Sequence, residues 1–371
     1  MKEKLKYCTK CVMPSTRPRV TFNAEGVCNA CQWAEDKKTA IDWSARWKQL
    51  EEFCEKYRSQ DGNFDVLLPV SGGKDSCYVS YRIKHDFGMH PLSVSIVPPF
   101  TFKIGDKNLD NFIAHGYDCI KIYPNIDISK RIARWAFIEY GQPLMSWIIA
   151  VQVAVFKTAI NFKIPFIMFG EEGEMEYGGT SKLRNSPFYR REDSIRIYCS
   201  NIQATEFLKE YSKKQLYWWL YPSEEEFEKA KLAIAHWSYF ESWDPYRNYL
   251  VAKEQFGLEE RSRPSIGTYT NFAQTDTPIF DLHHYLMYLK FGFGRCSADA
   301  SIDIRRGALN RDQAVELVRK FDNAYPEPYI DKYLDFFDMT KEEFDAVLDR
   351  HANKDLFKKV NGRWTPTFIV E

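Results

Sequence analysis

Residues 64–76 read Phe-Asp-Val-Leu-Leu-Pro-Val-Ser-Gly-Gly-Lys-Asp-Ser, an apolar run that stops at a short glycine-rich segment. The run predicts a buried strand over 64–70, and the residues from 75 to 87, followed by Gly88, predict a helix. A strand, a glycine-rich turn and a helix in this order direct backbone N–H groups and a positive helix end toward one point, which suits a phosphate group. Lys74 adds a charge at that point.

The loop over 71–76 differs from two common phosphate-binding loops. Neither the Walker A pattern Gly-x4-Gly-Lys-[Ser/Thr] nor the dinucleotide pattern Gly-x-Gly-x-x-Gly is present at this strand end. Ser-Gly-Gly-x-Asp-Ser resembles the signature of the PP-loop ATP pyrophosphatases, which cleave ATP to AMP and pyrophosphate; the alternative is an ordinary turn with two glycines. The resemblance implies that the loop binds ATP through Ser71, Gly72, Gly73, Lys74, Asp75 and Ser76.

Strand and helix patterns alternate from residue 64 to residue 169. We expect further strands at 91–97, 117–123 and 164–169, and helices at 75–87, 106–115, 127–140 and 144–162. This alternation predicts an α/β fold with a doubly wound, mainly parallel sheet, whose ligands bind beyond the carboxyl ends of the strands. Residues 180–262 lose this rhythm. We therefore divide the chain into a cysteine-rich segment with a linking helix (1–60), a PP-loop ATP-binding core (61–180) and a mostly helical, aromatic-rich region for substrate or partner (181–371).

The composition excludes several classes of protein. The charges balance at 51 basic and 51 acidic residues, so non-specific binding to nucleic acid is not expected. No run of about 18 apolar residues predicts a membrane span, and the N-terminus lacks the apolar region of a signal peptide. The chain contains 9 cysteines, which in a cytoplasmic protein are reduced or bound to metal. We expect a cytoplasmic protein that does not bind membranes.

Four cysteines near the N-terminus follow the pattern Cys-x2-Cys-x16-Cys-x2-Cys. Two such pairs can close a tetrahedral thiolate cage around Zn2+ without leaving an open position, so we predict a structural zinc site. A catalytic redox pair is the main alternative. The predicted zinc ligands are Cys8, Cys11, Cys28 and Cys31.

Two further segments carry candidate functional side chains. Residues 170–179 read Gly-Glu-Glu-Gly-Glu-Met-Glu-Tyr-Gly-Gly after a predicted core strand, and carboxylates at such a strand end can hold Mg2+ beside ATP phosphates. A solvated acidic loop is the alternative. Residues 290–295 read Lys-Phe-Gly-Phe-Gly-Arg, and residues 301–307 follow with two more arginines. Their glycines let cations approach an anionic group closely, although a helix end with solvated charges is equally compatible.

These motifs together resemble the N-acetyl sugar amidotransferases of bacterial surface polysaccharide and flagellar sugar biosynthesis, over about the first 310 residues. The resemblance rests on residues 7–14, 28–31, 71–76, 170–179 and 290–295. It implies that ATP activates a sugar acetamido group as an O-adenylyl imidate, which ammonia converts to an acetamidino group. It assigns catalysis to Lys74, Asp75, Glu171 and Glu174, and among these Mg2+ binding to Asp75 with Glu171 or Glu174. It assigns further ATP contacts to Gly170, and contacts with an acidic sugar to Tyr177, Lys290, Arg295 and Arg305.

The resemblance also implies partners. The chain has no Gly-x-Cys-x-Gly elbow for a glutaminase nucleophile, so we expect ammonia from a glutaminase–cyclase pair resembling imidazole glycerol phosphate synthase. A nucleotide-linked diacetamido uronic acid and a nonulosonic acid both fit as substrate. Two alternatives to the amidotransferase stay open, a PP-loop tRNA thiolase and a non-catalytic zinc-ribbon scaffold. Neutral charge and the lack of a second catalytic Cys-x-x-Cys count against the first, and the intact Lys-Asp-Ser counts against the second.

Overall fold

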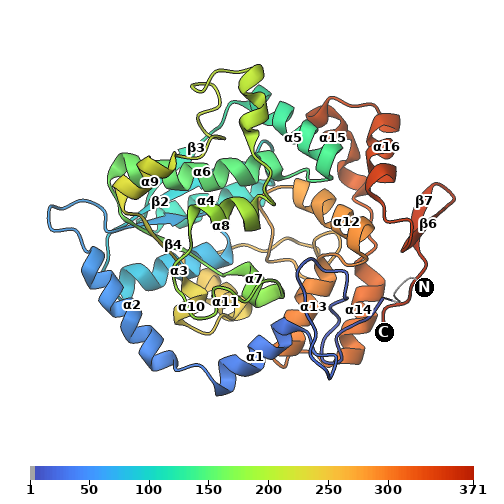
Figure 1. Cartoon of the computed structure of the whole chain (residues 1–371), viewed down its shortest axis with the longest axis horizontal. Coiled ribbons are helices and arrows are strands. Elements are labelled where there is room, and N and C mark those ends of the chain that lie inside the picture. The colour runs from blue at the N-terminus through green and yellow to red at the C-terminus, as the bar shows by residue number, and fades with distance from the viewer. Residues whose placement is uncertain (1–4) are drawn as a thin grey trace.

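A computed structural model describes residues 5–371. Its centre is a five-stranded sheet in the order β3-β2-β1-β4-β5, and every neighbouring pair of strands is parallel. Figure 1 shows the sheet between layers of helices, which confirms the predicted doubly wound α/β fold. The strands of this sheet are β1 (Val66–Pro69), β2 (Pro91–Ile96), β3 (Asp118–Ile122), β4 (Phe166–Phe169) and β5 (Ala233–His236).

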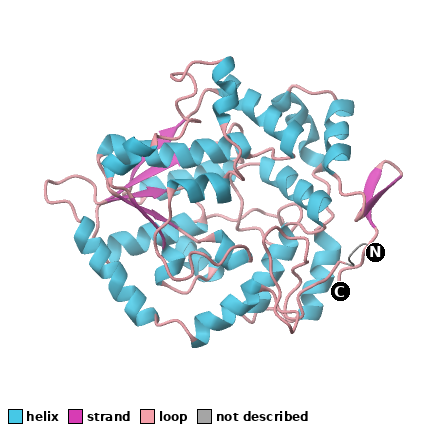
Figure 2. Ribbon diagram, in the orientation of Figure 1, coloured by secondary structure: helices cyan, strands magenta, loops and turns pink. Residues whose placement is uncertain are grey.

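Helices make up most of the rest of the structure, as Figure 2 shows in cyan. The α-helices are α1 (Asn29–Thr39), α2 (Trp43–Tyr57), α3 (Lys74–His85), α4 (Lys103–Ala114), α5 (Ile126–Tyr140), α6 (Met145–Phe162), α7 (Gly173–Tyr177), α8 (Arg191–Asp193), α9 (Glu224–Ala230), α10 (Trp237–Phe240), α11 (Pro245–Phe256), α12 (Ile279–Phe291), α13 (Arg295–Arg305), α14 (Arg311–Phe321), α15 (Ile330–Phe337) and α16 (Lys341–His351). A short π-helix, η1 (Ser194–Tyr198), and two 3-10 helices, η2 (Ala204–Lys209) and η3 (Glu327–Tyr329), complete the set.

Alternating side chains of the strands build two apolar layers. On β1, Leu67 packs with α5 and α6 on one face of the sheet, whereas Val66 and Leu68 pack with α2, α3 and α11 on the other. Both faces are therefore buried, as is usual for parallel sheets, and this explains why the strands read as continuous apolar runs. Among residues 5–371, one helix, α6, is long and apolar enough to cross a membrane, but 61% of its 18 residues are buried inside the protein.

The strand order reverses direction between β1 and β4. The chain runs outward from β1 through β2 to β3, and then returns to the other side of β1 to form β4 and β5. The loops after β1 and β4 therefore separate at the carboxyl edge of the sheet, which is where ligands bind in open α/β sheets. The glycine-rich loop over 71–73 and the acidic segment that starts at Gly170 are these two loops.

The structure corrects the expectation for residues 180–262. This region contains β5, which pairs with β4 along Phe166–Phe169 and so extends the sheet beyond the predicted core. The three-segment division stays a prediction, although the sheet itself crosses residue 180. A second unpredicted element is the antiparallel hairpin of β6 (Phe357–Val360) and β7 (Arg363–Pro366), which lies apart from the sheet at the right of Figure 2.

Candidate active site

The glycine-rich loop forms a tight turn between β1 and α3. Ser76 Oγ donates to the Gly73 carbonyl oxygen over 3.1 Å and accepts from the Ser71 amide over 3.4 Å, which fixes the turn from inside. Gly72 has φ +76°, and a Cβ atom there would lie 2.4 Å from the Leu109 backbone nitrogen on α4. Only glycine fits this position, so the loop sits tightly against α4 while its other side faces the sheet edge.

A cavity of about 300 Å3 opens beside this loop, and we call it the nucleotide cavity. Ser71, Asp75 and Ser76 line it from the loop and α3, and Gly170 and Glu171 line it from the end of β4. The C-terminal part of the chain contributes Asp276, whose carboxylate accepts a hydrogen bond from Ser71. A cavity of this size at the switch point of the sheet suits a nucleotide.

Asp75 and Glu171 form a pair of carboxylates in the nucleotide cavity. Burial, and after it the negative charge of Asp75, raise the pKa of Glu171 to about 7. Lys74 Nζ binds Asp75 Oδ2, and Asn248 Nδ2 donates to Asp75 Oδ1 over 2.9 Å. Two acidic oxygen donors beside a phosphate-binding loop have the chemistry of a Mg2+ site, because that cation takes oxygen ligands and would favour both charged forms.

Glu174 does not line the nucleotide cavity. Arg19 Nε and Nη2 each donate to its carboxylate over 2.6 Å, and the Thr180 amide donates over 2.9 Å. Although burial opposes it, the Arg19 guanidinium holds the pKa of Glu174 below its ordinary value. Two glutamates were predicted to act in catalysis. Glu171 lines the nucleotide cavity, whereas Glu174 forms a salt bridge with Arg19 away from it.

A second cavity, of about 250 Å3, is lined by Lys74, which does not line the nucleotide cavity, and we call it the acceptor cavity. Two of the residues that the resemblance assigns to the substrate, Tyr177 and Arg295, line it. Arg295 Nη2 binds Asp299 Oδ1 over 2.8 Å, while its Nε is buried and has no hydrogen-bond partner among the described residues. Burial, and then the charge of Glu171, raise the pKa of Tyr177.

One face of α13 supplies much of the acceptor cavity. Arg295, Asp299, Ile302, Asp303 and Arg306 follow the spacing of a single helix face and all line it. Sequence reasoning missed Arg306, although it lies in the segment 301–307 that had been singled out. The helical period counted from Arg295 would have selected Arg306 and not Arg305.

The other two predicted substrate residues lie elsewhere. Arg305 lines a smaller adjoining cavity of about 160 Å3, where its Nη2 donates to the Glu176 carbonyl oxygen over 3.0 Å. Lys290 lines none of these three cavities. Its Nζ donates to the backbone carbonyls of Tyr140 and Gly141 over 3.3 and 3.0 Å, and burial lowers the pKa of Lys290 to about 8. Lys290 therefore holds the C-terminal end of α5.

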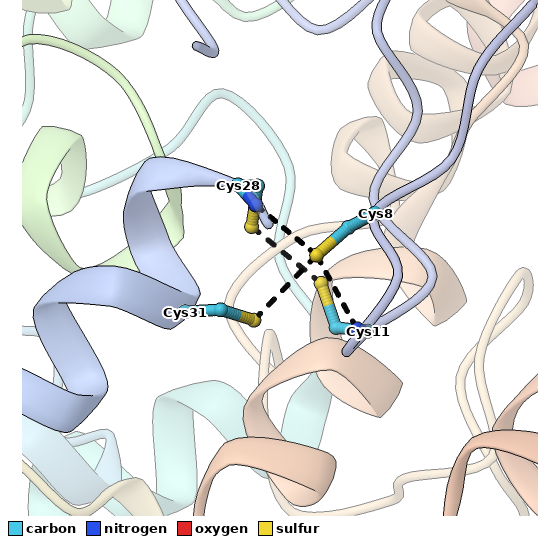
Figure 3. A group of neighbouring side chains, drawn as sticks. All are labelled: Cys8, Cys11, Cys28 and Cys31. Carbon is cyan, nitrogen blue, oxygen red and sulfur yellow. Dashed lines mark hydrogen bonds between the residues drawn. The ribbon is translucent and has the colours of Figure 1, made fainter. Parts of the chain in front are cut away.

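The four N-terminal cysteines come together as a compact cluster (Figure 3). Their sulfur atoms all lie within 4.8 Å of one another, with 3.9 Å between Cys8 and Cys31 and 3.7 Å between Cys11 and Cys28. Four thiolates at about 2.3 Å from one central Zn2+ would be separated by about 3.8 Å, so the donor set fits a single tetrahedral ion. Cys8 Sγ also accepts from the Cys28 amide over 3.2 Å.

One protein family and one solved structure illustrate what this chain is similar to. Residues 266–368 match the family described as "LPS biosynthesis protein WbpG-like, C-terminal domain". No curated protein matches the chain. A solved structure that the chain resembles is "U34-tRNA thiolase NcsA from Methanococcus maripaludis with its [4Fe-4S] cluster", at 11% identity over 71% of this chain and 79% of that chain, with a TM-score of 0.33. Over residues 266–368 the chain thus resembles the WbpG-like proteins of LPS biosynthesis, which confirms the family resemblance predicted from its motifs.

Proposed function

We propose that this protein is an ATP-dependent N-acetyl sugar amidotransferase, which converts a sugar acetamido group to an acetamidino group. One observation carries the proposal. Lys74 of the phosphate-binding loop lines the acceptor cavity, and most of the other walls of that cavity, from Tyr269 to Arg306, belong to the WbpG-like segment. An ATP loop and a segment typical of LPS biosynthesis therefore meet at one place, as an enzyme that activates a sugar with ATP requires.

The loop and the acidic pair have separate roles in this proposal. Ser71 and Ser76 line the nucleotide cavity beside Gly170, and their hydroxyls hold the phosphates of ATP. The backbone of Gly72 and Gly73 and the ammonium of Lys74 contribute from the same loop, although these three residues do not line the cavity. Asp75 and Glu171 hold Mg2+, which supplies positive charge against the phosphates when it is bound. The protein mainly positions the phosphates and stabilises the charge that develops on them.

The reaction proceeds in two steps. The acetamido oxygen attacks the α-phosphorus of ATP, a P–O bond forms, and pyrophosphate leaves as the amide N–H proton is lost. The product is an O-adenylyl imidate. Ammonia then adds to the imidate carbon, the C–O bond to AMP breaks, and an acetamidino group remains. Lys74, which lines the acceptor cavity, supplies a positive charge beside the acetamido group and the α-phosphate that it attacks.

The acceptor cavity suits an acidic sugar. Arg295 and Arg306 offer guanidinium groups that can pair with a carboxylate, although they also bind Asp299 and Asp303 of the same cavity. Tyr177 and Asn271 add groups that can bind hydroxyls or amides. A nucleotide-linked diacetamido uronic acid and a nonulosonic acid are both retained as substrates of this cavity.

Ammonia comes from a partner in this proposal. No cysteine among residues 5–371 lines the nucleotide cavity, the acceptor cavity or the smaller cavity at Arg305, so none of them supplies a glutaminase nucleophile there. We infer a glutaminase–cyclase pair resembling imidazole glycerol phosphate synthase. The four cysteines hold Zn2+ in a structural role, because all four are buried and leave no open position.

The test is a reconstituted reaction with the purified full-length chain. ATP, Mg2+, ammonium chloride and either candidate sugar should give AMP, pyrophosphate and a sugar in which NH replaces O, detected by chromatography and mass spectrometry. Glutamine in place of ammonium should give almost no amidine. Rapid amidine formation from glutamine alone would remove the need for a partner, and failure of both sugars to release AMP would refute the amidotransferase. Tight, salt-sensitive binding of tRNA would favour the thiolase instead.

A further inference from the structure

The segment from Glu171 to Thr180 links the nucleotide cavity to the acceptor cavity. Glu171 lines the first of them, α7 follows it directly, and Tyr177 at the end of α7 lines the second. Small movements of α7 would therefore change the position of side chains in both cavities. The contacts that hold α7 in place thus bear on the whole site.

The beginning of this segment is anchored to the sheet. The Glu172 amide donates to Ser238 Oγ over 2.8 Å, and the Ser238 amide donates to the Gly170 carbonyl oxygen over 3.2 Å. Ser238 follows β5, so these two bonds tie the first residues to the α/β core. The end of the segment, residues 174–180, is held differently.

Side chains of the N-terminal region hold both glutamates in the second half of the segment. We call residues 7–39, which comprise the cysteine cluster and α1, the ribbon. Arg19 binds Glu174 through two bonds of 2.6 Å. From α1, Trp33 Nε1 donates to Glu176 Oε1 over 3.0 Å, and Lys37 Nζ donates to Glu176 Oε2 over 2.7 Å. Both carboxylates are buried, so losing these partners would leave unpaired charges in the interior.

The ribbon also binds the backbone just after α7. Arg17 Nε donates to the Gly178 carbonyl oxygen over 2.7 Å, and Asn29 Nδ2 donates to the Gly179 carbonyl oxygen over 2.6 Å. The approach is close, because a Cβ atom at Gly178 would lie 3.2 Å from Asn29 Oδ1 and 3.3 Å from the Ala30 Cβ. Asn29 and Ala30 immediately follow the zinc ligand Cys28, so the cysteine cluster and the α7 contacts share one short stretch of chain.

Arg305 connects the two directly. Its Nη1 lies 4.0 Å from Cys11 Sγ, and its Nη2 donates to the Glu176 carbonyl oxygen over 3.0 Å. Arg311 makes an instructive comparison, because it also binds the ribbon. Its Nε and Nη2 donate to the carbonyls of Cys11 and Cys8, each over 3.3 Å, but it has no contact with α7.

We propose that the ribbon is a positioning element of the active site, in which the metal-bound cysteines, through Arg305 and α1, set the placement of Tyr177 and Glu171. This inference rests on the proposed function for its effect on catalysis, but its structural part does not. A metal at the four thiolates fixes the ribbon, and the ribbon holds residues 174–180. Because these residues form the second half of the segment from Glu171 to Thr180, they determine where Tyr177 and Glu171 lie. The two apolar layers of the α/β core contain no residue of the ribbon.

The test compares Arg305→Met with Arg311→Met in the full-length, zinc-loaded protein. Arg305→Met should keep its zinc and its thermal unfolding midpoint, while hydrogen exchange of amides 174–180 becomes about 10-fold faster, because the variant loses one hydrogen bond from a charged group to the Glu176 carbonyl oxygen. The kcat for AMP formation should fall about 10-fold, with the KM for ATP nearly unchanged. Arg311→Met should leave the exchange of these amides at the wild-type rate. Lys37→Met, remote from the thiolates, should repeat the effect of Arg305→Met.

Removal of zinc with a chelator is the complementary measurement. Exchange should become faster in residues 5–39 and in residues 174–180, and stay slow in β1, β4 and α6. Exchange that becomes faster in residues 5–39 alone, or uniformly over the whole chain, would overturn the proposal. A higher KM for the sugar without faster exchange in Arg305→Met would also overturn it, because Arg305 would then act by binding substrate. If the exchange result holds but no sugar is turned over, only the proposed function fails.

Discussion

A methyl group added at Gly72 should disable the phosphate-binding loop. The Cβ atom of Gly72→Ala would lie 2.4 Å from the nitrogen and 2.5 Å from the Cα of Leu109, both of them backbone atoms of α4 that cannot rotate away. Ordinary contact begins at 3.4 Å, so the loop must retreat by about 1 Å. A displacement of 1 Å at a reacting group costs about 100-fold in rate, or about 2.7 kcal/mol of barrier. The expected result is a fall of about 100-fold in kcat/KM for ATP, measured by AMP release.

A matched control separates this clash from backbone strain. Gly62 has φ +81°, close to the φ of Gly72, but nothing lies within 4 Å of its Cβ position. Gly62→Ala should lower the free energy of unfolding by about 1–2 kcal/mol, which is the usual strain of a left-handed residue, and leave ATP turnover unchanged. Calorimetry with ATP gives an independent measure of the loop. A folded Gly72→Ala protein that binds and turns over ATP within about threefold of wild type would refute the reasoning.

Three other changes test the rest of the site. The pKa of Glu171 is raised to about 7 in the metal-free site, so Mg2+ affinity, measured by calorimetry, should rise with pH up to about 7 and this pH dependence should disappear in Glu171→Gln; a persisting dependence would assign the titration to another group. Arg295→Met should raise the KM for the acidic sugar about 10-fold or more, with little change for ATP, whereas Lys290→Met should leave both KM values unchanged. Equal effects of the two variants would contradict their separate locations. Cys28→Ser should reduce bound zinc from one ion per chain, measured by elemental analysis; full occupancy would show that Cys28 is not a ligand.

The sequence was a good guide where local pattern decides the structure. The strands and helices from residue 66 to residue 169 follow the prediction closely, because β1, β2 and β4 are largely buried runs and α5 ends at Gly141, whereas the edge strand β3 is more exposed. β5 escaped notice because Ala233-Ile-Ala-His236 has a single β-branched residue. It becomes a strand through pairing with β4 and burial, which are properties of the fold and not of its own propensity.

The parts of the site that depend on local motifs could be predicted from the sequence, whereas those that depend on contacts between distant residues could not. The cysteine spacing and the phosphate-binding loop are local signals, and they survive in the structure as a compact thiolate cluster and a loop at the switch point. Which glutamate faces the nucleotide cavity is not a local matter. Glu174 is bound by Arg19, a residue 155 positions away in the sequence. The spacing of residues within 170–179 therefore cannot predict that Glu174 lies outside the cavity. The position of Lys290 is not a local matter either, since its partners are carbonyls at the end of α5.

The packing of the ribbon against the far end of the chain has a consequence for folding during synthesis. Phe293 packs among the four cysteines, and Arg305 and Arg311 bind around them, so the ribbon lacks these partners until residue 311 has been made. Roughly 280 residues separate Cys31 from Arg311, which at 5–20 residues per second is a delay of roughly 15–60 s. We expect the nascent thiols to stay reactive toward maleimide throughout that interval. Early protection on stalled shorter chains would show that metal captures the ribbon before its neighbours exist.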